Sequence, residues 1–186
     1  MAVVVGGRTY LDGIDLTPAE LYRRLAAGSA VPTTSAPTPD AYREALSKAS
    51  QETAAALCIT VSRSFSASLD SARLAADRVM TESPRFEISV LDSGSAAGGE
   101  GLVALAAQRA AEAGAGLDEV VTVAQTAADR VRLIAYVDTL QYLWRGGRVP
   151  GIAHGMTRLL KLKPIFEMSR GDVSKKLPSR TSRRAR

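Results

Sequence analysis

Two short segments rich in serine and threonine hydroxyls each stand directly before a stretch that is expected to form a helix. They are residues 33–38 (Thr-Thr-Ser-Ala-Pro-Thr) and residues 62–68 (Ser-Arg-Ser-Phe-Ser-Ala-Ser). The start of a helix leaves backbone N–H groups unpaired and carries a partial positive charge. Hydroxyls added at such a place form a group of hydrogen-bond donors that suits a carboxylate or a phosphate. The two segments together predict an anion-binding site.

The order of apolar and capping residues predicts the elements that position these hydroxyls. Helices are expected near residues 17–28, 38–49, 67–80, 96–113 and 117–129, a short one from 142 ending at Gly146-Gly147, and strands near 54–61, 86–91 and 132–137. Such alternation favours a largely parallel sheet flanked by helices, because parallel neighbours need a crossover connection. The predicted fold class is therefore α/β.

Two loops directly follow predicted strands, the serine-rich segment 62–68 and residues 92–95 (Asp-Ser-Gly-Ser). Ligands of such sheets bind outside the carboxyl ends of the strands, so we expect both loops on one rim. Candidates for lining that rim are Ser35, Ala67, Ser68 and Ser93. A serine before a helix is often only a cap or a turn residue, and that alternative stays open for Ser35, Ser64 and Ser68.

The positive charge of the chain is concentrated at its end. Residues 169–186 carry seven basic residues and one acidic residue, so the total of +5 leaves −1 for residues 1–168. A nearly neutral body offers no basic face to a phosphate backbone, and no nucleic-acid partner is expected. Nucleic-acid binding through the basic tail remains an alternative.

Composition points to one main domain in a reducing compartment. The chain has 186 residues, of which 46% are apolar and 23% are charged, an ordinary balance for a globular protein. Its one cysteine, Cys58, lies in the apolar run 54–61 and is interpreted as a buried, reduced thiol. No apolar segment reaches the length of a membrane span, so we expect a cytoplasmic protein.

Six segments of the chain form an ordered set of motifs. They are residues 7–13 (Gly-Arg-Thr-Tyr-Leu-Asp-Gly), 34–37 (Thr-Ser-Ala-Pro), 62–72, 90–93 (Val-Leu-Asp-Ser), 137–149 and 159–165 (Leu-Leu-Lys-Leu-Lys-Pro-Ile). In this order they resemble the DegV family of bacterial fatty-acid-binding proteins. The resemblance implies that residues 1–165 form a DegV-like lipid-binding domain. Residues 166–186 are then the truncated start of a mostly absent second domain, or a basic tail.

The resemblance also implies a function. A DegV-like protein buries a long-chain fatty acid and holds its carboxylate with a Thr of the first hydroxyl segment and a Ser of the second, here Thr34 and Ser66. Such a carrier exchanges lipid with membranes and presents the acid to a separate fatty acid kinase, which makes an acyl phosphate for phospholipid synthesis. The carrier is not an enzyme and needs no cofactor or metal. Arg148, next to two glycines, is a candidate contact for the kinase.

The chain departs from the family pattern at three places. Members usually have Ser-Gly-Thr where residues 66–68 read Ser-Ala-Ser, Gln where Ala36 stands, and an opening strand with an Asp-Ser motif that is absent here.

An enzyme alternative, a phosphoryl-transfer or hydrolase domain using the same anion site, remains open. The chain lacks the Gly-x4-Gly-Lys-[Ser/Thr] and Gly-x-Gly-x-x-Gly motifs that would support a nucleotide site.

Overall fold

A computed structural model describes residues 1–28, 31–139, 141–148 and 163–179, and of residues 141, 163–164 and 175–179 only the backbone. The chain divides into two compact units, each considered by itself. The first comprises Met1–Ala36, Tyr136–Ile165 and Leu177–Arg186, and the second Pro37–Ala135 and Phe166–Lys176. Most of the segment 159–165 and the basic residues at 180–186 lie outside the described residues. The domain boundary at residue 165 stays a prediction.

The first unit is built on a small antiparallel sheet with the strand order β2-β1-β3. Its strands are β1 (Ala2–Val5), β2 (Arg8–Leu11) and β3 (Thr33–Ser35), and its helices are α1 (Pro18–Ala26) and α6 (Gln141–Arg145). Gly6 and Gly7 both have positive φ, 57° and 78°, as the two-residue turn between β1 and β2 requires. Val3, Val5 and Leu16 form its core.

Helix α1 begins as its capping residues predict. The Thr17 side chain accepts a hydrogen bond from the backbone N–H of Glu20, and Pro18 occupies the first turn. Leu16, only 3% exposed, packs with Leu21 and fixes the direction of the chain before the helix. Glu20 forms ion pairs with Arg23 and Arg24 on the helix surface.

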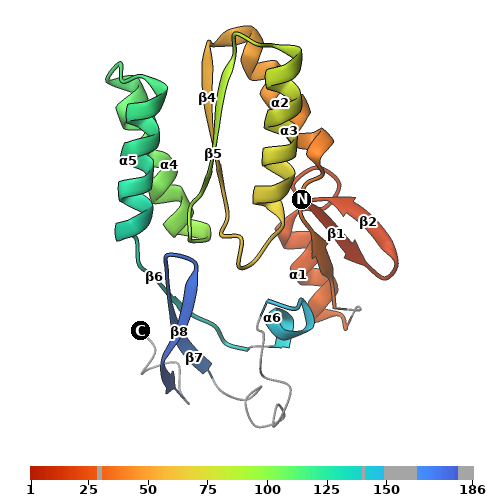
Figure 1. Ribbon diagram of the computed structural model, residues 1–186. Helices are drawn as coiled ribbons and strands as arrows, with labels where there is room; N and C mark the ends of the chain where they lie inside the picture. The colour runs from red at the N-terminus through yellow and green to blue at the C-terminus, as the bar shows by residue number, and fades with distance from the viewer. Residues whose placement is uncertain (29–30, 140, 149–162, 180–186) are drawn as a thin grey trace. The chain divides into compact units, whose positions relative to one another are not determined.

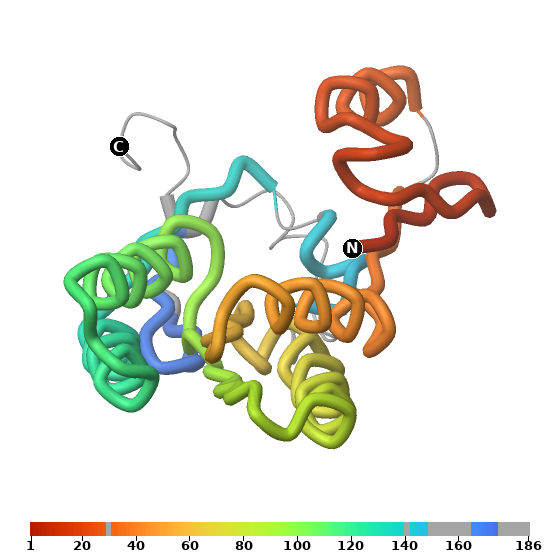
Figure 2. Tube along the Cα trace, turned by 90° about the horizontal axis from the view of Figure 1, so that it is seen from above, coloured from red at the N-terminus to blue at the C-terminus, as the bar shows by residue number. Residues whose placement is uncertain are grey.

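The second unit has three layers around a parallel strand pair. Strands β4 (Ala55–Thr60) and β5 (Glu87–Asp92) pair from Ala55 with Glu87 to Thr60 with Asp92. Helices α2 (Pro39–Glu52) and α3 (Ser68–Glu82) lie side by side on one face, and α4 (Ala97–Glu112) and α5 (Leu117–Arg130) on the other (Figures 1 and 2). Each face has its own apolar core, one around Leu46, Val79 and Phe86 and the other around Leu91 and Val103.

A third sheet has the strand order β6-β7-β8, with β6 (Leu133–Tyr136), β7 (Lys163–Ser169) and β8 (Asp172–Ser179). The turn between β7 and β8 consists of Arg170 and Gly171, whose φ values are 54° and 81°. Positive φ at both central residues is the signature of a type I′ hairpin, whose twist matches that of the strands. Met168, near the end of β7, is 1% exposed and anchors the hairpin.

The expected helices and strands of the second unit, and the α/β class, are confirmed with boundaries shifted by a few residues. The strands of β1–β3 and the β7–β8 hairpin were not expected from the sequence. Cys58 is half-buried rather than buried, because β4 pairs only with β5 among the described strands. None of the helices in the described part of the chain combines the length and the apolar character needed to cross a bilayer.

Candidate functional site

The loops that follow β4 and β5 are joined at one end of the strand pair, as the sequence predicts. The Ser62 backbone N–H donates to the Ser95 carbonyl at 2.7 Å, and the Ser93 N–H donates to the Thr60 carbonyl at 3.0 Å. Thr60 and Ser62 are 2% and 0% exposed. These buried backbone bonds fix the two loops relative to each other and to the strands that carry them.

Ser66 stands just before α3 and is a half-buried residue. Its Oγ accepts a hydrogen bond from the Ser68 backbone N–H at 3.2 Å and lies 2.8 Å from Ser68 Oγ. If Ser68 donates in that pair, the Ser66 O–H is left to donate to an anion. The N-cap residue Ala67 makes no side-chain cap, so Ser66 is the hydroxyl that serves the helix start. Anion binding by Ser66 stays a prediction.

The other rim candidates of this unit differ in exposure. Ala67 is exposed and Ser68 is 5% exposed. Ser93 is fully buried, and its hydroxyl donates to the Ser95 carbonyl at 3.3 Å and accepts from the Ser95 N–H at 3.2 Å. Ser93 therefore shapes its loop from inside instead of facing the rim. The hydroxyl of Ser64 likewise serves the loop, by donating to the Gly171 carbonyl at 2.7 Å.

The remaining candidates belong to the first unit. Thr34 and Ser35 lie on β3, exposed, and pair across the sheet with Val3 and Ala2 of β1. Arg148 follows α6, is half-buried, and donates from its guanidinium to the Gly146 carbonyl. The convergence of Thr34 with Ser66 of the second unit stays a prediction.

The turn of the β7–β8 hairpin is a neighbour of the site that the sequence analysis missed. The Gly171 N–H donates to the Gly94 carbonyl at 2.8 Å, and Ser64 reaches the same glycine from the other loop. An indication was present in the sequence, since Arg170-Gly171 separates two segments that tolerate a strand and glycine is favoured at the second position of a type I′ turn. Local sequence patterns do not predict the contact, because the bonded residues are more than 75 positions apart in the chain.

Half-buried titratable groups lie beside the strand pair. Burial raises the pKa of the Glu100 carboxyl, and the negative charge of Asp92 adds to the effect. Burial also raises the pKa of the Cys58 thiol, with a smaller contribution from Glu100. Burial raises the pKa of the Tyr42 phenol as well, against the lowering effect of a hydrogen bond with Ser68 and with smaller raising effects from Cys58 and Glu100. Among the described residues, no three His, Cys, Asp or Glu side chains lie close enough together to hold a metal ion.

The raised pKa of Glu100 makes stability depend on pH. Because the folded state holds this proton more tightly than the unfolded state, the contribution of Glu100 to stability is complete below its unfolded pKa and is lost as pH rises through its folded pKa. Glu100→Gln is therefore expected to raise the melting temperature at pH 7 to 8, with a gain that fades below about pH 4. Thermal melts across this range test it, with Glu112→Gln in the same helix as the control for losing one negative charge. A gain that grows as the pH falls would contradict the prediction.

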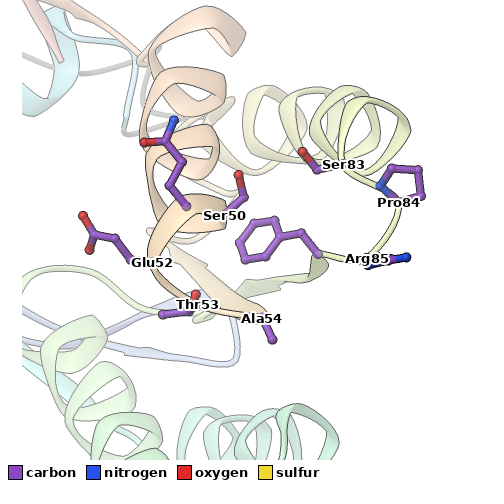
Figure 3. Close-up of a pocket in the computed structure, with 9 residues that line it drawn as sticks. Ser50, Glu52, Thr53, Ala54, Ser83, Pro84 and Arg85 are labelled. Atoms are coloured by element: carbon purple, nitrogen blue, oxygen red, sulfur yellow. The ribbon is translucent and has the colours of Figure 1, made fainter.

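An open pocket of about 660 Å³ lies at the opposite end of the strand pair, where α2 and α3 end and β4 and β5 begin. Figure 3 shows Ser50 and Thr53 on one side of it and Ser83, Pro84 and Arg85 on the other. Its lining includes none of the residues that follow the strands. The pocket is therefore separate from the serine-rich loop.

The fold is that of an α/β protein with a serine-rich loop at the carboxyl ends of a parallel strand pair. A model of the DegV family, described as uncharacterised proteins, matches residues 1–186. A DegV domain-containing protein of Streptomyces coelicolor is 33% identical over 185 residues, which is 100% of this chain and 64% of that protein. The chain belongs to the DegV family, and it spans less than two thirds of the length of this relative.

Solved structures of the family have the same fold. A Thermus thermophilus DegV protein, described as binding fatty acid, is 30% identical and superposes with a TM-score of 0.84, covering 99% of this chain and 64% of that one. A stearic-acid-binding protein of Eubacterium ventriosum is 27% identical with a TM-score of 0.88 over the same shares. The family assignment made from the motifs is confirmed.

Proposed function

We propose that this protein binds a long-chain fatty acid and holds its carboxylate with the hydroxyls of Ser66 and Thr34. The observation that carries the proposal is the position of Ser66, a half-buried residue at the start of α3, next to the carboxyl ends of β4 and β5. Related proteins of known structure are described as binding fatty acids. The proposed donors are uncharged hydroxyls, which can replace part of the water around one carboxylate.

Strand β4 carries apolar side chains that begin next to the serine-rich loop and pack toward the helices on both faces. Its residues Ala55 to Ile59 are each only half-buried, although helices cover both faces of the strand pair. A strand of six residues is about 20 Å long. The proposed acyl chain would run beside β4 and cover the part of these residues that is still exposed.

Burial of the acyl chain alone does not explain specific binding. Roughly fifteen methylenes at about 0.8 kcal/mol each favour leaving water by about 12 kcal/mol, but a membrane offers the same gain. The preference for the protein over a membrane must therefore come from the carboxylate, through charge-assisted hydrogen bonds of about 1.5–3 kcal/mol each. This reasoning makes the hydroxyls the decisive part of the proposed site.

The proposed role is that of a carrier which presents the fatty acid to a separate kinase. The resemblance to the DegV family supports it, and Arg148 beside Gly146 and Gly147 is the proposed contact for the kinase. Since the carboxylate is the group to be phosphorylated, it must become accessible without leaving the protein. The carrier itself performs no chemistry in this scheme.

A competition assay tests the proposed function. A bound fluorescent fatty acid is displaced with hexadecanoate and, separately, with hexadecanol of the same chain length. Hexadecanoate is expected to compete at least about tenfold better, because only the carboxylate makes the charge-assisted bonds. Equal potency of the two ligands, or no binding of the probe, would contradict the proposal. Turnover of an acyl or phosphoryl ester would favour the enzyme alternative instead.

A further inference from the structure

The turn of the β7–β8 hairpin touches both loops that follow the parallel strands. From the loop after β4, the Ser64 hydroxyl donates to the Gly171 carbonyl at 2.7 Å. From the loop after β5, the Gly94 carbonyl accepts from the Gly171 N–H at 2.8 Å. One peptide segment of the hairpin thus bonds to both loops, and all three residues belong to the second unit.

Two glycines with positive φ lie at this contact, and one of them, Gly94, also stands close to the backbone of the hairpin. Gly171 has a φ of 81°, and a Cβ there would lie 3.4 Å from Ser62 Oγ and 3.5 Å from Ser64 Oγ. Gly94 has a φ of 58°, and a Cβ there would lie 3.1 Å from the Cα of Arg170 and from the N of Gly171. Both positions have a conformation that suits glycine, and at Gly94 the hairpin backbone also approaches closely, whereas a Cβ at Gly171 would make only ordinary contacts with two serine hydroxyls. The contact therefore depends on two glycines far apart in the sequence.

The hairpin is held to the second unit by further contacts. The guanidinium of Arg170 donates from Nε to the Asp129 carbonyl at 3.3 Å and lies 4.0 Å from the Asp129 carboxylate. Arg132 forms an ion pair with Glu167 at 3.6 Å. Together with the buried Met168, these contacts tie β7 to the region around the end of α5. These contacts fix the position of the turn independently of the two loops that follow β4 and β5, so the turn can restrain those loops.

We infer that the turn of the β7–β8 hairpin acts as a clip that keeps residues 62–68 in the conformation that presents Ser66 to a carboxylate. Ser64, Gly94 and Gly171 are then positioning residues, which do not touch the ligand. The inference rests on the proposed fatty-acid binding. It adds that the site depends on a segment about a hundred residues later in the chain.

The first test compares Ser64→Ala with Ser64→Thr, which keeps a hydroxyl. Amide hydrogen exchange of residues 62–68 is measured on the ligand-free protein, followed by fatty-acid affinity and dissociation rate. Ser64→Ala is expected to speed exchange in this loop and to weaken binding about two- to tenfold, mainly through faster dissociation. Ser64→Thr is expected to restore both. Thr81→Ala, which removes a 2.8 Å bond from a hydroxyl to the Asp77 carbonyl in α3, is the matched control.

The second test displaces the turn from the other loop. Gly94→Ala adds a Cβ against the hairpin backbone and is expected to weaken binding by about tenfold or more. Gly98→Ala is the control, since a Cβ there has no neighbour within 4 Å among the described atoms.

If amide hydrogen exchange of residues 62–68 is unchanged in both Ser64→Ala and Gly94→Ala, the inference that the hairpin turn holds this loop is wrong. Faster exchange with unchanged affinity would overturn its role in binding. If the wild type binds no fatty acid, the proposed function fails, while the exchange data still show whether the clip exists.

Discussion

Replacing Ser66 by alanine is expected to weaken fatty-acid binding by about tenfold or more. The variant removes one hydroxyl donor to the carboxylate, and a charge-assisted hydrogen bond of about 1.5–3 kcal/mol corresponds to one or two factors of ten in affinity. Titration with a fluorescent fatty acid measures the change. Thr81→Ala, an exposed threonine of the same helix, is expected to bind like the wild type.

Ser66 also serves the start of α3, so its two roles must be separated. Ser66 Oγ accepts from the Ser68 N–H, and loss of such a cap lowers stability by about 1 kcal/mol. Ser66→Asp keeps an oxygen acceptor for the helix but places a negative charge at the carboxylate. We expect this variant to melt near the wild-type temperature and to lose fatty-acid binding. Retained fatty-acid affinity in both Ser66 variants would remove this residue from the site.

The prediction for Thr34 concerns the other unit. Thr34→Ala, on the exposed edge strand β3, is expected to change stability little and to weaken fatty-acid binding by roughly tenfold or more. Thr33→Ala on the same strand is the control. Binding that is lost in Ser66→Ala and unchanged in Thr34→Ala would mean that the carboxylate site lies in the second unit alone.

Replacing Gly99 by alanine is expected to have the largest effect on stability. Gly99 lies in α4 and is buried, and a Cβ there would stand 2.0 Å from Ser95 Oγ and 3.2 Å from Val131 Cγ1. Ser95 is 1% exposed, so its side chain has little space to move. Overpacking of this kind destabilises by about 1–3 kcal/mol, which lowers the melting temperature by several degrees.

The same helix provides the controls for Gly99. Gly98 and Gly101 are exposed, with no described atom within 4 Å of a Cβ, so alanine at either is expected to stabilise by roughly 0.5–1 kcal/mol. Ser95 Oγ has no hydrogen-bond partner among the described residues, so Ser95→Ala should not destabilise. The double variant Ser95→Ala/Gly99→Ala should recover part of the stability that Gly99→Ala loses, because the serine hydroxyl that the new Cβ would strike is gone. A Gly99→Ala variant as stable as Gly98→Ala would contradict the packing described here.

Local signals in the sequence were sufficient to predict the elements of the second unit, including the helix start next to Ser66. Thr38 caps α2 through the Ala41 N–H, and the apolar run at 54–61 forms β4 because it packs against helices on both faces. The position of Ser66 at a helix start follows from the order of strand, loop and helix. Such features depend on neighbours within a few residues, which is why the sequence alone indicates them.

Long-range contacts could not be predicted in the same way. Ser93 and Ser66 look alike in the sequence, yet Ser93 is fully buried and bonded inside its loop while Ser66 is partly exposed. The bond from Ser64 to Gly171 joins segments separated by 107 residues. Strands β1 and β3 have only four and three residues, which is too short to show a clear periodicity. They pair directly with each other although α1 lies between them in the sequence.

Mass spectrometry of the purified protein, first under native and then under denaturing conditions, tests the central claim most directly. The wild type is expected to carry an adduct with the mass of a long-chain fatty acid, which denaturation releases, and Ser66→Ala is expected to carry less of it. A wild-type protein that copurifies with no fatty acid and takes up none when it is supplied would contradict the account.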